Sequence, residues 1–421
     1  MKTVCILGLG HIGLPTACLF ATHSYYVVGV DTNKEVVNKI NRGEAPFGEP
    51  GLEELLQKAL KINNFIARTE PGLADVFIIA TPTPLEKEAR IADLIHVQEA
   101  ARNIARFLKQ GDMVILESTV PPGASERLLL PILEGSGLKG GQDFHLVHCP
   151  ERAIPGNTIN EMIHSDRIIG GINRESAELA KNIYSCFVKG NLYLTNLPTA
   201  ETVKLMENTF RDINIALANE LAQIAEASSV NIWEAIELAN KHPRVNILKP
   251  GPGVGGHCLA IDPWFLTENS VNSRIISLAR EINDSMPQHV LSLVKQLVGR
   301  IQNGTITVLG AAYKADVEDT RESPAIRFIK LSQKEGCQIK VHDPLAKELK
   351  DNLYTLEEAA QDSDCLVLIT DHTQFKQIKP EAVSRVMRNK NLVDTRNLLN
   401  HEIWREAGFK VKILGDGTWQ T

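Results

Sequence analysis

Apolar and polar positions in the first part of the chain follow the pattern of alternating strands and helices. Short apolar runs, typical of buried parallel strands, are separated by longer segments in which apolar residues recur at helical spacing. The runs lie at residues 3–7, 26–30, 76–80, 113–117 and 145–148. Such alternation predicts a mostly parallel, doubly wound α/β sheet.

The pattern changes in the middle of the chain and then returns. Residues 195–228 keep a helical period, with apolar side chains at Val203, Met206, Phe210, Leu217, Leu221 and Ile224. Strand signals reappear at 305–309, 338–341, 365–369 and 392–393, separated by helical segments such as 324–334. At 421 residues the chain is long enough for two or three domains. We expect two α/β domains, 1–194 and 301–421, joined by a long central helix and a helical middle domain at 195–300.

A glycine motif follows the first predicted strand. Gly8, Gly10 and Gly13 form G-x-G-x-x-G ahead of a predicted helix, and Asp31 ends the next strand, on the order of 20 residues later. The glycines permit a tight turn, close approach of the backbone to a pyrophosphate, and packing of helix on strand. Asp31 is expected to accept from ribose hydroxyls, which favours NAD over NADP because a carboxylate repels a 2′-phosphate. The alternative, a glycine turn without a ligand, is disfavoured by the strand–helix context. A Rossmann-like domain is therefore predicted.

Polar residues also follow three later strands, at Thr81, Ser118 with Thr119, and Glu151. Open parallel sheets bind ligands outside the carboxyl ends of their strands, so these residues are candidates for the same site. Alternatively, Thr81 and Ser118 cap the helices that follow them.

A polar stripe is predicted on the central helix. Lys204, Asn208 and Arg211 are spaced i, i+4, i+7 and share one helix face, because each residue turns the helix by about 100°. One interpretation is an ordinary solvated face. The other is a lysine and an asparagine that stabilise a developing alkoxide and order a water.

A cysteine ends a glycine-rich segment at residues 250–258. The thiol of Cys258 is a candidate nucleophile, with Asp262 placed to order a water and His257 either a base partner or a structural residue. No Gly-Lys-Ser or Gly-Lys-Thr closes the segment, which argues against a P-loop. A nicotinamide site together with such a thiol suits two successive oxidations, from alcohol to aldehyde and then to acid.

The net charge and the composition indicate which classes of binding partner to expect. The net charge of −6 is mild and mixed in sign along the chain, so we expect neither a nucleic-acid nor a membrane partner. No apolar stretch reaches the roughly 18 residues of a spanning helix, and no cleavable leader precedes the first strand, so a cytoplasmic location is expected. The seven cysteines show no C-x-x-C spacing, which predicts neither a disulfide framework nor a metal site.

Taken together, these residues resemble the nucleotide-sugar 6-dehydrogenases related to UDP-glucose dehydrogenase, over essentially the whole chain. The motifs that carry the likeness are 8–13, 117–121, 149–152, Lys204 with Asn208, 255–258 with Asp262, 312–314 with 321–324, and 394–396. The resemblance implies oxidation of C6 of the sugar to a carboxylate with two NAD. Cys258 would form a thiohemiacetal and then a thioester, which water hydrolyses.

The resemblance also implies roles for individual residues. The catalytic set would be Cys258, Lys204, Asn208, Asp262 and Glu151. The NAD contacts would be Gly8, Gly10, Ile12, Gly13, Asp31, Thr81, Thr119, Glu151 and Arg321. The UDP-sugar contacts would be Arg152, Ala153, Lys204, Asn208, Arg211, His242, Arg244, Gly255, Tyr313, Lys314 and Arg396. The central helix would join subunits in a homodimer or larger homo-oligomer, with Arg244 crossing into the partner's site.

One departure from the usual pattern bears on the substrate. Relatives that oxidise UDP-glucose or GDP-mannose usually carry a proline and then a lysine between the cysteine and the aspartate, whereas this chain reads Leu-Ala-Ile at 259–261. Residues 242–265 look most like the branch that oxidises UDP-N-acetyl-D-mannosamine, with UDP-N-acetylglucosamine as the second candidate. Two alternatives of other classes are a one-step hydroxy-acid dehydrogenase, which requires neither Cys258 nor a second α/β domain, and a non-catalytic nucleotide-sugar-binding protein.

Overall fold

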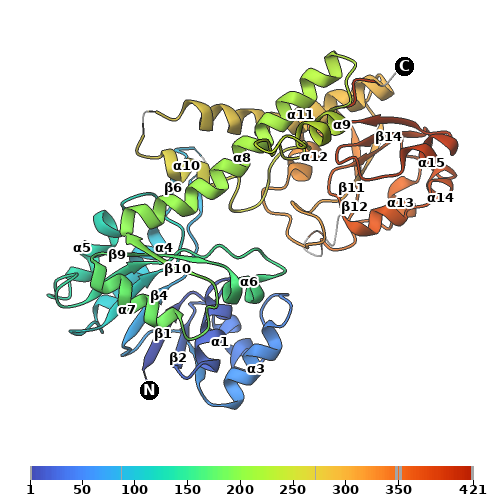
Figure 1. The fold of residues 1–421 in the computed structure, drawn as a ribbon. Helices are drawn as coiled ribbons and strands as arrows, with labels where there is room; N and C mark the ends of the chain where they lie inside the picture. The colour runs from blue at the N-terminus through green and yellow to red at the C-terminus, as the bar shows by residue number, and fades with distance from the viewer. Residues whose placement is uncertain (1, 87, 271, 347–348, 350–352, 419–421) are drawn as a thin grey trace. The chain divides into compact units, whose positions relative to one another are not determined.

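The computed structural model describes residues 2–86, 88–270, 272–346, 349 and 353–418. Its internal contacts divide the chain into two units (Figure 1). The first unit comprises Met1–Glu207 with Trp264–Ser270, and the second comprises Asn208–Pro263 with Val271–Thr421. The chain passes from the first to the second inside helix α8, Leu197–Ala227.

The first unit contains an eight-stranded sheet in the order β10-β9-β8-β7-β4-β1-β2-β3. Every neighbouring pair is parallel except β8 and β9. The strands are β1 (Thr3–Leu7), β2 (Tyr26–Val30), β3 (Phe65–Arg68), β4 (Val76–Ile79), β7 (Met113–Leu116), β8 (His145–His148), β9 (Arg167–Gly171) and β10 (Leu192–Asn196). The five strands predicted from the apolar runs are confirmed, two of them ending one residue early. Strands β3, β9 and β10 were not predicted, because charged, glycine and half-exposed residues interrupt their apolar pattern.

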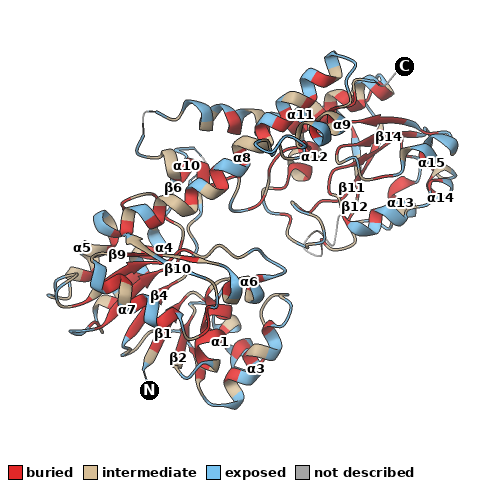
Figure 2. Ribbon diagram, in the orientation of Figure 1, coloured by how far each residue is buried: buried red, intermediate tan, exposed pale blue. Residues whose placement is uncertain are grey.

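Helices cover both faces of this sheet. Val4 and Ile6 of β1 pack into one apolar core, whereas Cys5 and Leu7 pack into another, because successive side chains of a strand point to opposite faces. The first core includes residues of α1 (Gly13–Thr22), α2 (Lys34–Asn41), α3 (Leu52–Lys61), α6 (Thr158–His164) and α7 (Arg174–Tyr184). The second includes residues of α4 (Ile95–Ala105) and α5 (Leu130–Glu134). The predicted doubly wound sheet is thus confirmed, and Figure 2 shows its strands as mostly buried.

A short hairpin of β5 (Leu85–Glu86) and β6 (Ile91–Ala92) lies outside the sheet. The guanidinium of Arg90 lies 4.3 Å from the centre of the Trp264 ring, and Ala92 N donates to Glu268 Oε2 at 2.9 Å. These contacts attach residues 264–270, which include most of α10 (Asp262–Thr267), to the first unit.

The second unit contains a five-stranded, fully parallel sheet in the order β12-β11-β13-β14-β15. Its strands are β11 (Thr305–Leu309), β12 (Gln338–His342), β13 (Cys365–Leu368), β14 (Asn391–Asp394) and β15 (Lys410–Ile413). Its helices are α9 (Ile232–Ala239), α11 (Arg274–Val298), α12 (Pro324–Lys334), α13 (Leu356–Ala360), α14 (Pro380–Ser384) and α15 (His401–Glu406). Helix α12 has the predicted bounds: Ser323 accepts from Ala325 N at 3.1 Å, and Pro324 fits the first turn. The second predicted α/β domain is therefore present.

The central helix confirms the helical prediction over residues 197–227, whereas Thr195 and Asn196, predicted as helical, end strand β10. Pro198 lies in the first turn of the helix. Proline is tolerated there because a backbone N–H in the first turn has no partner within the helix. The large apolar side chains of Met206, Phe210, Leu217 and Ile224 are exposed by 46% or more. The buried residues of the helix are instead mostly small or polar, among them Asn208, Asp212, Ala218, Asn219 and Ala222. Among the described residues no helix is both long and apolar enough to cross a bilayer.

Candidate active site

The glycine motif forms a tight turn between β1 and α1. Gly8 has a φ of 94°, and a Cβ there would lie 2.6 Å from Ala80 O. A Cβ on Gly13 would lie 1.8 Å from Gly8 O, so only glycine lets the helix pack this closely on the turn. A Cβ on Gly10, in contrast, would meet no atom within 4 Å. The backbone at Gly10 is therefore open for the approach of a ligand.

Asp31 lies at the end of β2, beside this turn. Its Oδ2 accepts from Leu9 N at 3.1 Å and its Oδ1 from Asn33 N at 2.9 Å. Two backbone amides thus fix a carboxylate next to the glycine turn. This is the arrangement that ribose recognition requires.

The ends of β4 and β7 place Thr81 and Ser118 together. Ser118 Oγ donates to Thr81 O at 2.7 Å, so the hydroxyl ties the two strand ends instead of capping a helix. Thr81 Oγ1 is buried and has no hydrogen-bond partner in the described part of the chain. Strand β1 lies between β2 and β4, where the chain order reverses, and this is the ligand position of such sheets. The orphaned hydroxyl, the open backbone at Gly10 and the fixed carboxylate of Asp31 fit a dinucleotide.

Glu151, two residues after Cys149 at the end of β8, is held on both oxygens. Its Oε1 accepts from Arg152 N at 2.7 Å and Ala153 N at 2.9 Å, and its Oε2 pairs with a guanidinium nitrogen of Arg167 at 2.6 Å. Its side chain is 8% exposed. The carboxylate thereby fixes the turn that carries Arg152 and Ala153.

Behind Glu151 lies a buried polar cluster that sequence reasoning missed. Arg167 approaches Glu117 to 3.9 Å, and Glu117 also accepts from Tyr184 Oη at 2.7 Å and Thr16 Oγ1 at 3.3 Å. Burial raises the pKa of Glu117 to about 7, although the nearby Arg167 opposes the rise. The only sequence signal was an arginine at the head of an apolar strand, which is costly to bury without a partner.

The side chain of Arg152 pairs with Glu207, a carboxylate on the part of α8 that belongs to the first unit. Its Nε and a terminal nitrogen pair with Glu207 at 3.0 and 2.7 Å, and its other terminal nitrogen donates to Asp166 O at 2.8 Å. Lys204, three residues before Glu207, is half-buried. The first unit therefore brings together the predicted residues at 151–153 with the stretch of helix that carries Lys204.

In the second unit, the segment from Pro250 to Cys258 forms the cysteine loop. Glycine lets it pass close to its neighbours: a Cβ on Gly251 would lie 2.6 Å from the guanidinium of Arg396, and one on Gly256 would lie 2.8 Å from the ring of Tyr313. The structure thus places Tyr313 and Arg396, predicted residues of two distant segments, beside one loop.

Asn208 and Asp262 connect the end of this loop to α8. Asn208 Nδ2 donates to Asp262 Oδ2 at 2.6 Å, and Asp262 N donates to Cys258 O at 2.8 Å. The amide, the carboxylate and the cysteine backbone therefore form one connected group.

Cys258 differs from the other cysteines in its exposure. All seven lie within the described residues; five are buried, Cys186 is half-buried, and only Cys258 is exposed. Burial raises the pKa of the thiols of Cys5, Cys18 and Cys149 to about 12. A thiolate that reacts with a ligand is therefore best supplied by Cys258.

The remaining predicted residues lie at the surface of their units. Arg211, His242, Arg244, Lys314 and Arg321 are exposed, and Ile12 and Thr119 are half-buried. Arg321 pairs with Asp319 at 2.6 Å. Gly255 lies against Glu322 O, which a Cβ would approach to 2.6 Å. Among the described residues, no group of three or more His, Cys, Asp or Glu side chains is arranged to hold a metal ion.

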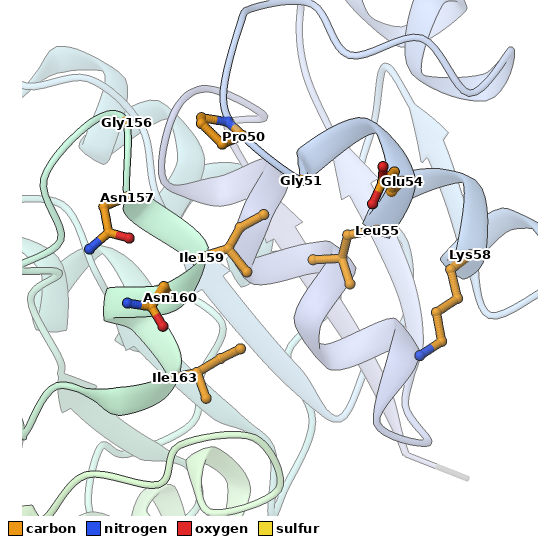
Figure 3. Close-up of a pocket in the computed structure, with 10 residues that line it drawn as sticks. All are labelled: Pro50, Gly51, Glu54, Leu55, Lys58, Gly156, Asn157, Ile159, Asn160 and Ile163. Carbon is orange, nitrogen blue, oxygen red and sulfur yellow. The ribbon is translucent and has the colours of Figure 1, made fainter.

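A separate hollow of about 520 Å³ lies between α3 and α6 (Figure 3). Leu55 on α3 and Ile159 and Ile163 on α6 line its sides, with Glu54 and Lys58 as its charged groups. None of the predicted site residues lines it.

Three family models of the UDP-glucose/GDP-mannose dehydrogenase family match: the NAD binding domain at residues 2–188, the central domain at 198–285 and the UDP binding domain at 307–401. A UDP-N-acetyl-D-mannosamine dehydrogenase of Methanococcus maripaludis is 48% identical over 427 residues, covering 100% of this chain and 98% of the relative.

Two further relatives extend the comparison. The solved structure of a UDP-D-ManNAc dehydrogenase from Pyrococcus horikoshii is 40% identical and superimposes with a TM-score of 0.93, covering 99% of this chain and 100% of that one. An NDP-N-acetyl-D-galactosaminuronic acid dehydrogenase of Ralstonia nicotianae is 42% identical, covering 94% of this chain and 96% of the relative.

Proposed function

Because the chain belongs to the UDP-glucose/GDP-mannose dehydrogenase family, whose models match its three successive segments, we propose that it oxidises C6 of UDP-N-acetyl-D-mannosamine to the uronate. The full-length relatives that act on this sugar support the substrate. The observation that carries the chemistry is the exposed thiol of Cys258, joined through the loop backbone to the Asn208–Asp262 pair.

The enzyme is an NAD-dependent dehydrogenase. When bound, NAD would supply a hydride acceptor for each of the two proposed oxidations. The groups that would hold it are the open backbone at Gly10, the fixed carboxylate of Asp31 and the unsatisfied hydroxyl of Thr81. We assign the other predicted cofactor contacts, Gly8, Ile12, Gly13, Thr119, Glu151 and Arg321, to the same role. Glu151, which is also kept in the proposed catalytic set, would in addition fix the 151–153 turn, because its Oε1 accepts from two backbone amides of that turn.

The chain's own groups would act in sequence. The C6 hydroxyl would lose its proton to water, and Lys204 and Asn208 would stabilise the resulting alkoxide, from which C6 gives up its hydride to form the aldehyde. The thiolate of Cys258 then adds to the aldehyde carbon, forming a C–S bond and a thiohemiacetal that retains the intermediate. Loss of the second hydride leaves a thioester. A water oriented by Asp262 attacks its carbonyl, breaking the C–S bond to give the carboxylate and return the thiolate.

The second unit would bind the nucleotide. Its parallel sheet matches the UDP binding model, and Lys314 and Arg396 supply cations suited to a diphosphate. Arg152, Ala153, Arg211, His242, Gly255 and Tyr313 complete the proposed UDP-sugar contacts. We retain residues 1–194, 195–300 and 301–421 as the proposed division into cofactor, central and nucleotide domains.

A homodimer or larger homo-oligomer is part of the proposal. Phe210, Leu217 and Ile224 recur every seven residues on α8 and are exposed by 63%, 46% and 55%. Exposed apolar side chains along one helix face are typical of a subunit interface. Arg244, which is also exposed, would reach the partner's site. A cytoplasmic location completes the proposal.

The decisive assay counts NADH formed per sugar consumed, with UDP-N-acetylmannosamine as substrate. Two NADH per sugar are expected, because the thiol retains the aldehyde for a second oxidation. A ratio of one would contradict the four-electron scheme and favour a one-step dehydrogenase. Parallel assays with the gluco and galacto epimers of the N-acetylhexosamine test the sugar. If either has a higher kcat/KM than the manno epimer, the assigned substrate is wrong.

A further inference from the structure

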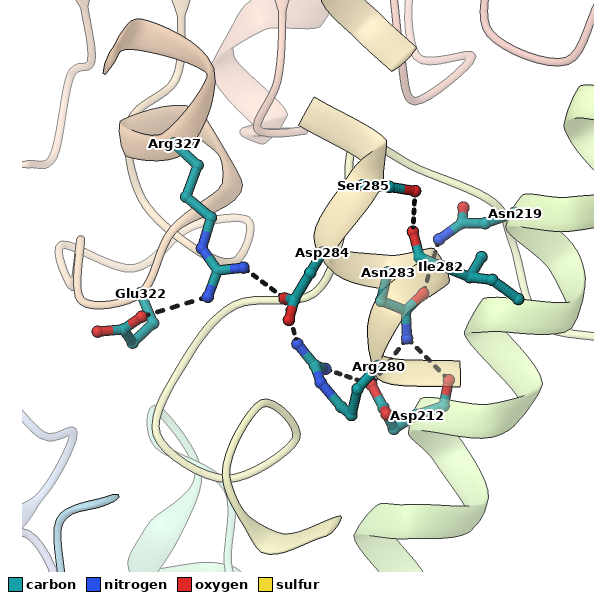
Figure 4. Close-up of polar contacts among 9 residues, drawn as sticks. All are labelled: Asp212, Asn219, Arg280, Ile282, Asn283, Asp284, Ser285, Glu322 and Arg327. Carbon is teal, nitrogen blue, oxygen red and sulfur yellow. Dashed lines mark hydrogen bonds and ion pairs between the residues drawn. The ribbon is translucent and has the colours of Figure 1, made fainter. Parts of the chain in front are cut away.

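A polar network in the second unit, buried at its centre, joins three helices and lies outside the residues assigned above (Figure 4). Its members come from α8, α11, α12 and the segment that precedes α12. They are Asp212, Asn219, Arg280, Asn283, Asp284, Arg327 and Glu322.

The network centres on a charge pair between α8 and α11. A terminal nitrogen of Arg280 donates to Asp212 Oδ1 at 2.6 Å, and Asn283 Nδ2 donates to the same oxygen at 2.8 Å and to Asp212 O at 3.0 Å. The side chains of Asp212 and Arg280 are 0% and 1% exposed. Burial raises the pKa of Asp212, and Arg280 opposes the rise.

The network continues to α12. The other terminal nitrogen of Arg280 donates to Asp284 Oδ1 at 2.6 Å, and Arg327 pairs with the same carboxylate. Arg327 also reaches Glu322 Oε2 at 3.4 Å. Helix α11 is thus tied to α8 on one side and to the start of α12 on the other.

Residues of the network contact the cysteine loop at three successive glycines. Asn219 Oδ1 accepts from Gly251 N at 2.8 Å, while its Nδ2 donates to Asn283 Oδ1 at 2.9 Å. A Cβ on Gly253 would lie 2.9 Å from Asn283 O, and one on Gly255 would lie 2.6 Å from Glu322 O. The path of the loop therefore depends on the elements that the network joins.

Stability alone is a weak explanation for such a network. A buried ion pair loses about as much free energy by desolvation as it gains by attraction. Asp212 Oδ2 and Arg280 Nε are also buried without a hydrogen-bond partner in the described part of the chain, which adds to the cost. What the network does supply is a single geometry, because any displacement would leave a buried charge or amide unpaired.

We propose that Asn219, Asn283 and the Asp212–Arg280 pair are positioning residues for Cys258, which hold the cysteine loop where the thiolate meets the aldehyde. This rests on the proposed function, in which Cys258 is the nucleophile. Because only the second oxidation uses the thiol, loosening the loop should impair that step selectively.

The test variant is Asn219→Ala, which removes the bonds to Gly251 and Asn283 without removing a charge. The matched control is Asn391→Ala, a buried asparagine of the same unit whose Nδ2 donates to Asp364 O at 2.8 Å. Two measurements are made on the full-length enzyme. One is the rate of iodoacetamide alkylation of Cys258 against pH, with the modified peptide identified by mass spectrometry. The other is NADH formed per sugar, with released aldehyde trapped by semicarbazide.

In Asn219→Ala we expect the alkylation rate of Cys258 to change by about fivefold or more, since the loop loses its fixed position. NADH per sugar should fall from two towards one, with trapped aldehyde making up the difference. The first oxidation in a single turnover should stay within about threefold of the wild type. Asn391→Ala should match the wild type in both measurements, even where its melting temperature falls equally.

The proposal is overturned if Asn219→Ala matches the wild type in alkylation and in NADH per sugar, or if it slows both oxidations equally. If Asn219→Ala does not fold, two other variants are judged by the same criteria. One is Asn283→Ala. The other is the double variant Asp212→Leu with Arg280→Met, which replaces the buried ion pair by apolar side chains, a change that proteins often tolerate. A wild type that forms one NADH per sugar refutes the proposed function instead. Alkylation, which needs no substrate, still reports on the loop in that case.

Discussion

At the scale of single residues, burial determines which groups react and which only hold others in place. Cys258 is exposed, whereas the other thiols are buried or half-buried, so its reactivity follows from its position in a glycine-rich loop. Glu151 is buried and accepts hydrogen bonds on both oxygens, which fixes the turn that carries Arg152 and Ala153. Position in the fold thus distinguishes the exposed thiol, which we propose as the nucleophile, from a buried carboxylate that holds a turn.

Replacing the nucleophile tests the thiol directly. In Cys258→Ser, the hydroxyl is a weaker nucleophile and its oxygen ester hydrolyses slowly, so turnover should fall by at least about a hundredfold. Steady-state NADH formation measures the loss, and intact-protein mass spectrometry detects any accumulated ester. Cys186→Ser, at the half-buried cysteine, is the control. Wild-type turnover in Cys258→Ser would make the thiol structural.

Glu117 makes stability depend on pH. Burial raises its pKa from 4.5 to about 7, so the folded protein keeps a proton that the unfolded chain releases. The contribution of the neutral carboxyl to the stability of the folded protein is fully present below pH 4.5. This contribution is lost as the pH rises through about 7. The loss is up to about 3 kcal/mol, the free-energy equivalent of the pKa difference.

Glu117→Gln, which stays neutral, should therefore lose less stability than the wild type between pH 5 and pH 8. Urea unfolding at the two pH values measures the difference. The exposed Glu53→Gln should behave as the wild type. Equal pH dependence in Glu117→Gln and the wild type would show that the carboxyl is already ionised in the folded protein at pH 5.

At the scale of elements, turns and helix starts place the chemistry. The β1–α1 turn depends on Gly8 and Gly13, which allow contacts that no side chain could replace. Helix α8 presents polar residues on its buried side and large apolar residues on its exposed side. An element's contribution to function therefore depends on which of its faces the fold covers.

Three glycine substitutions separate binding from folding at the β1–α1 turn. In Gly13→Ala the new Cβ would lie 1.8 Å from Gly8 O, so both thermal stability and NAD affinity should fall. In Gly10→Ala the Cβ meets no protein atom, so stability should persist while NAD affinity falls by about tenfold or more. Gly72→Ala, whose Cβ also meets nothing within 4 Å, is the control for both. Wild-type NAD affinity in Gly10→Ala, measured by calorimetry, would show that the pyrophosphate does not pass over this backbone.

At the scale of the whole molecule, two α/β units carry separate sets of the residues proposed for the site. The first presents the strand-end groups suited to NAD, and the second carries Cys258 and the UDP binding domain. In the proposed assembly, the exposed apolar residues of α8 would form the subunit interface and the exposed Arg244 would complete the partner's site.

Mixing two inactive variants tests whether Arg244 acts in the partner's site. Arg244→Ala and Cys258→Ser should each be inactive alone. If Arg244 acts in trans, a mixed dimer holds one intact site, and random mixing should restore roughly a quarter of wild-type activity. If Arg244 acts within its own subunit, mixing should restore none. Size-exclusion chromatography with light scattering checks that the subunits have exchanged.

The sequence by itself determined the local features of this protein. The strands at 3–7, 26–30, 145–148 and 305–309, the helix at 324–334 and the glycine turn before α1 follow from hydrophobic period and turn chemistry. The spacing of Asp31 after the glycines is equally local. A few adjacent residues are enough to specify each of these features, because the interactions that produce them act over short distances along the chain.

Only the tertiary structure decided which polar groups are paired in the interior. Arg167 lies 16 residues from its partner Glu151, and Arg280 lies 68 residues from Asp212. The same holds for α8, where Met206, Phe210, Leu217 and Ile224 belong to a stripe with the spacing of a core-facing helix but are exposed. No local period encodes these outcomes, because whether a charge or an apolar side chain is buried depends on which distant segment packs against it.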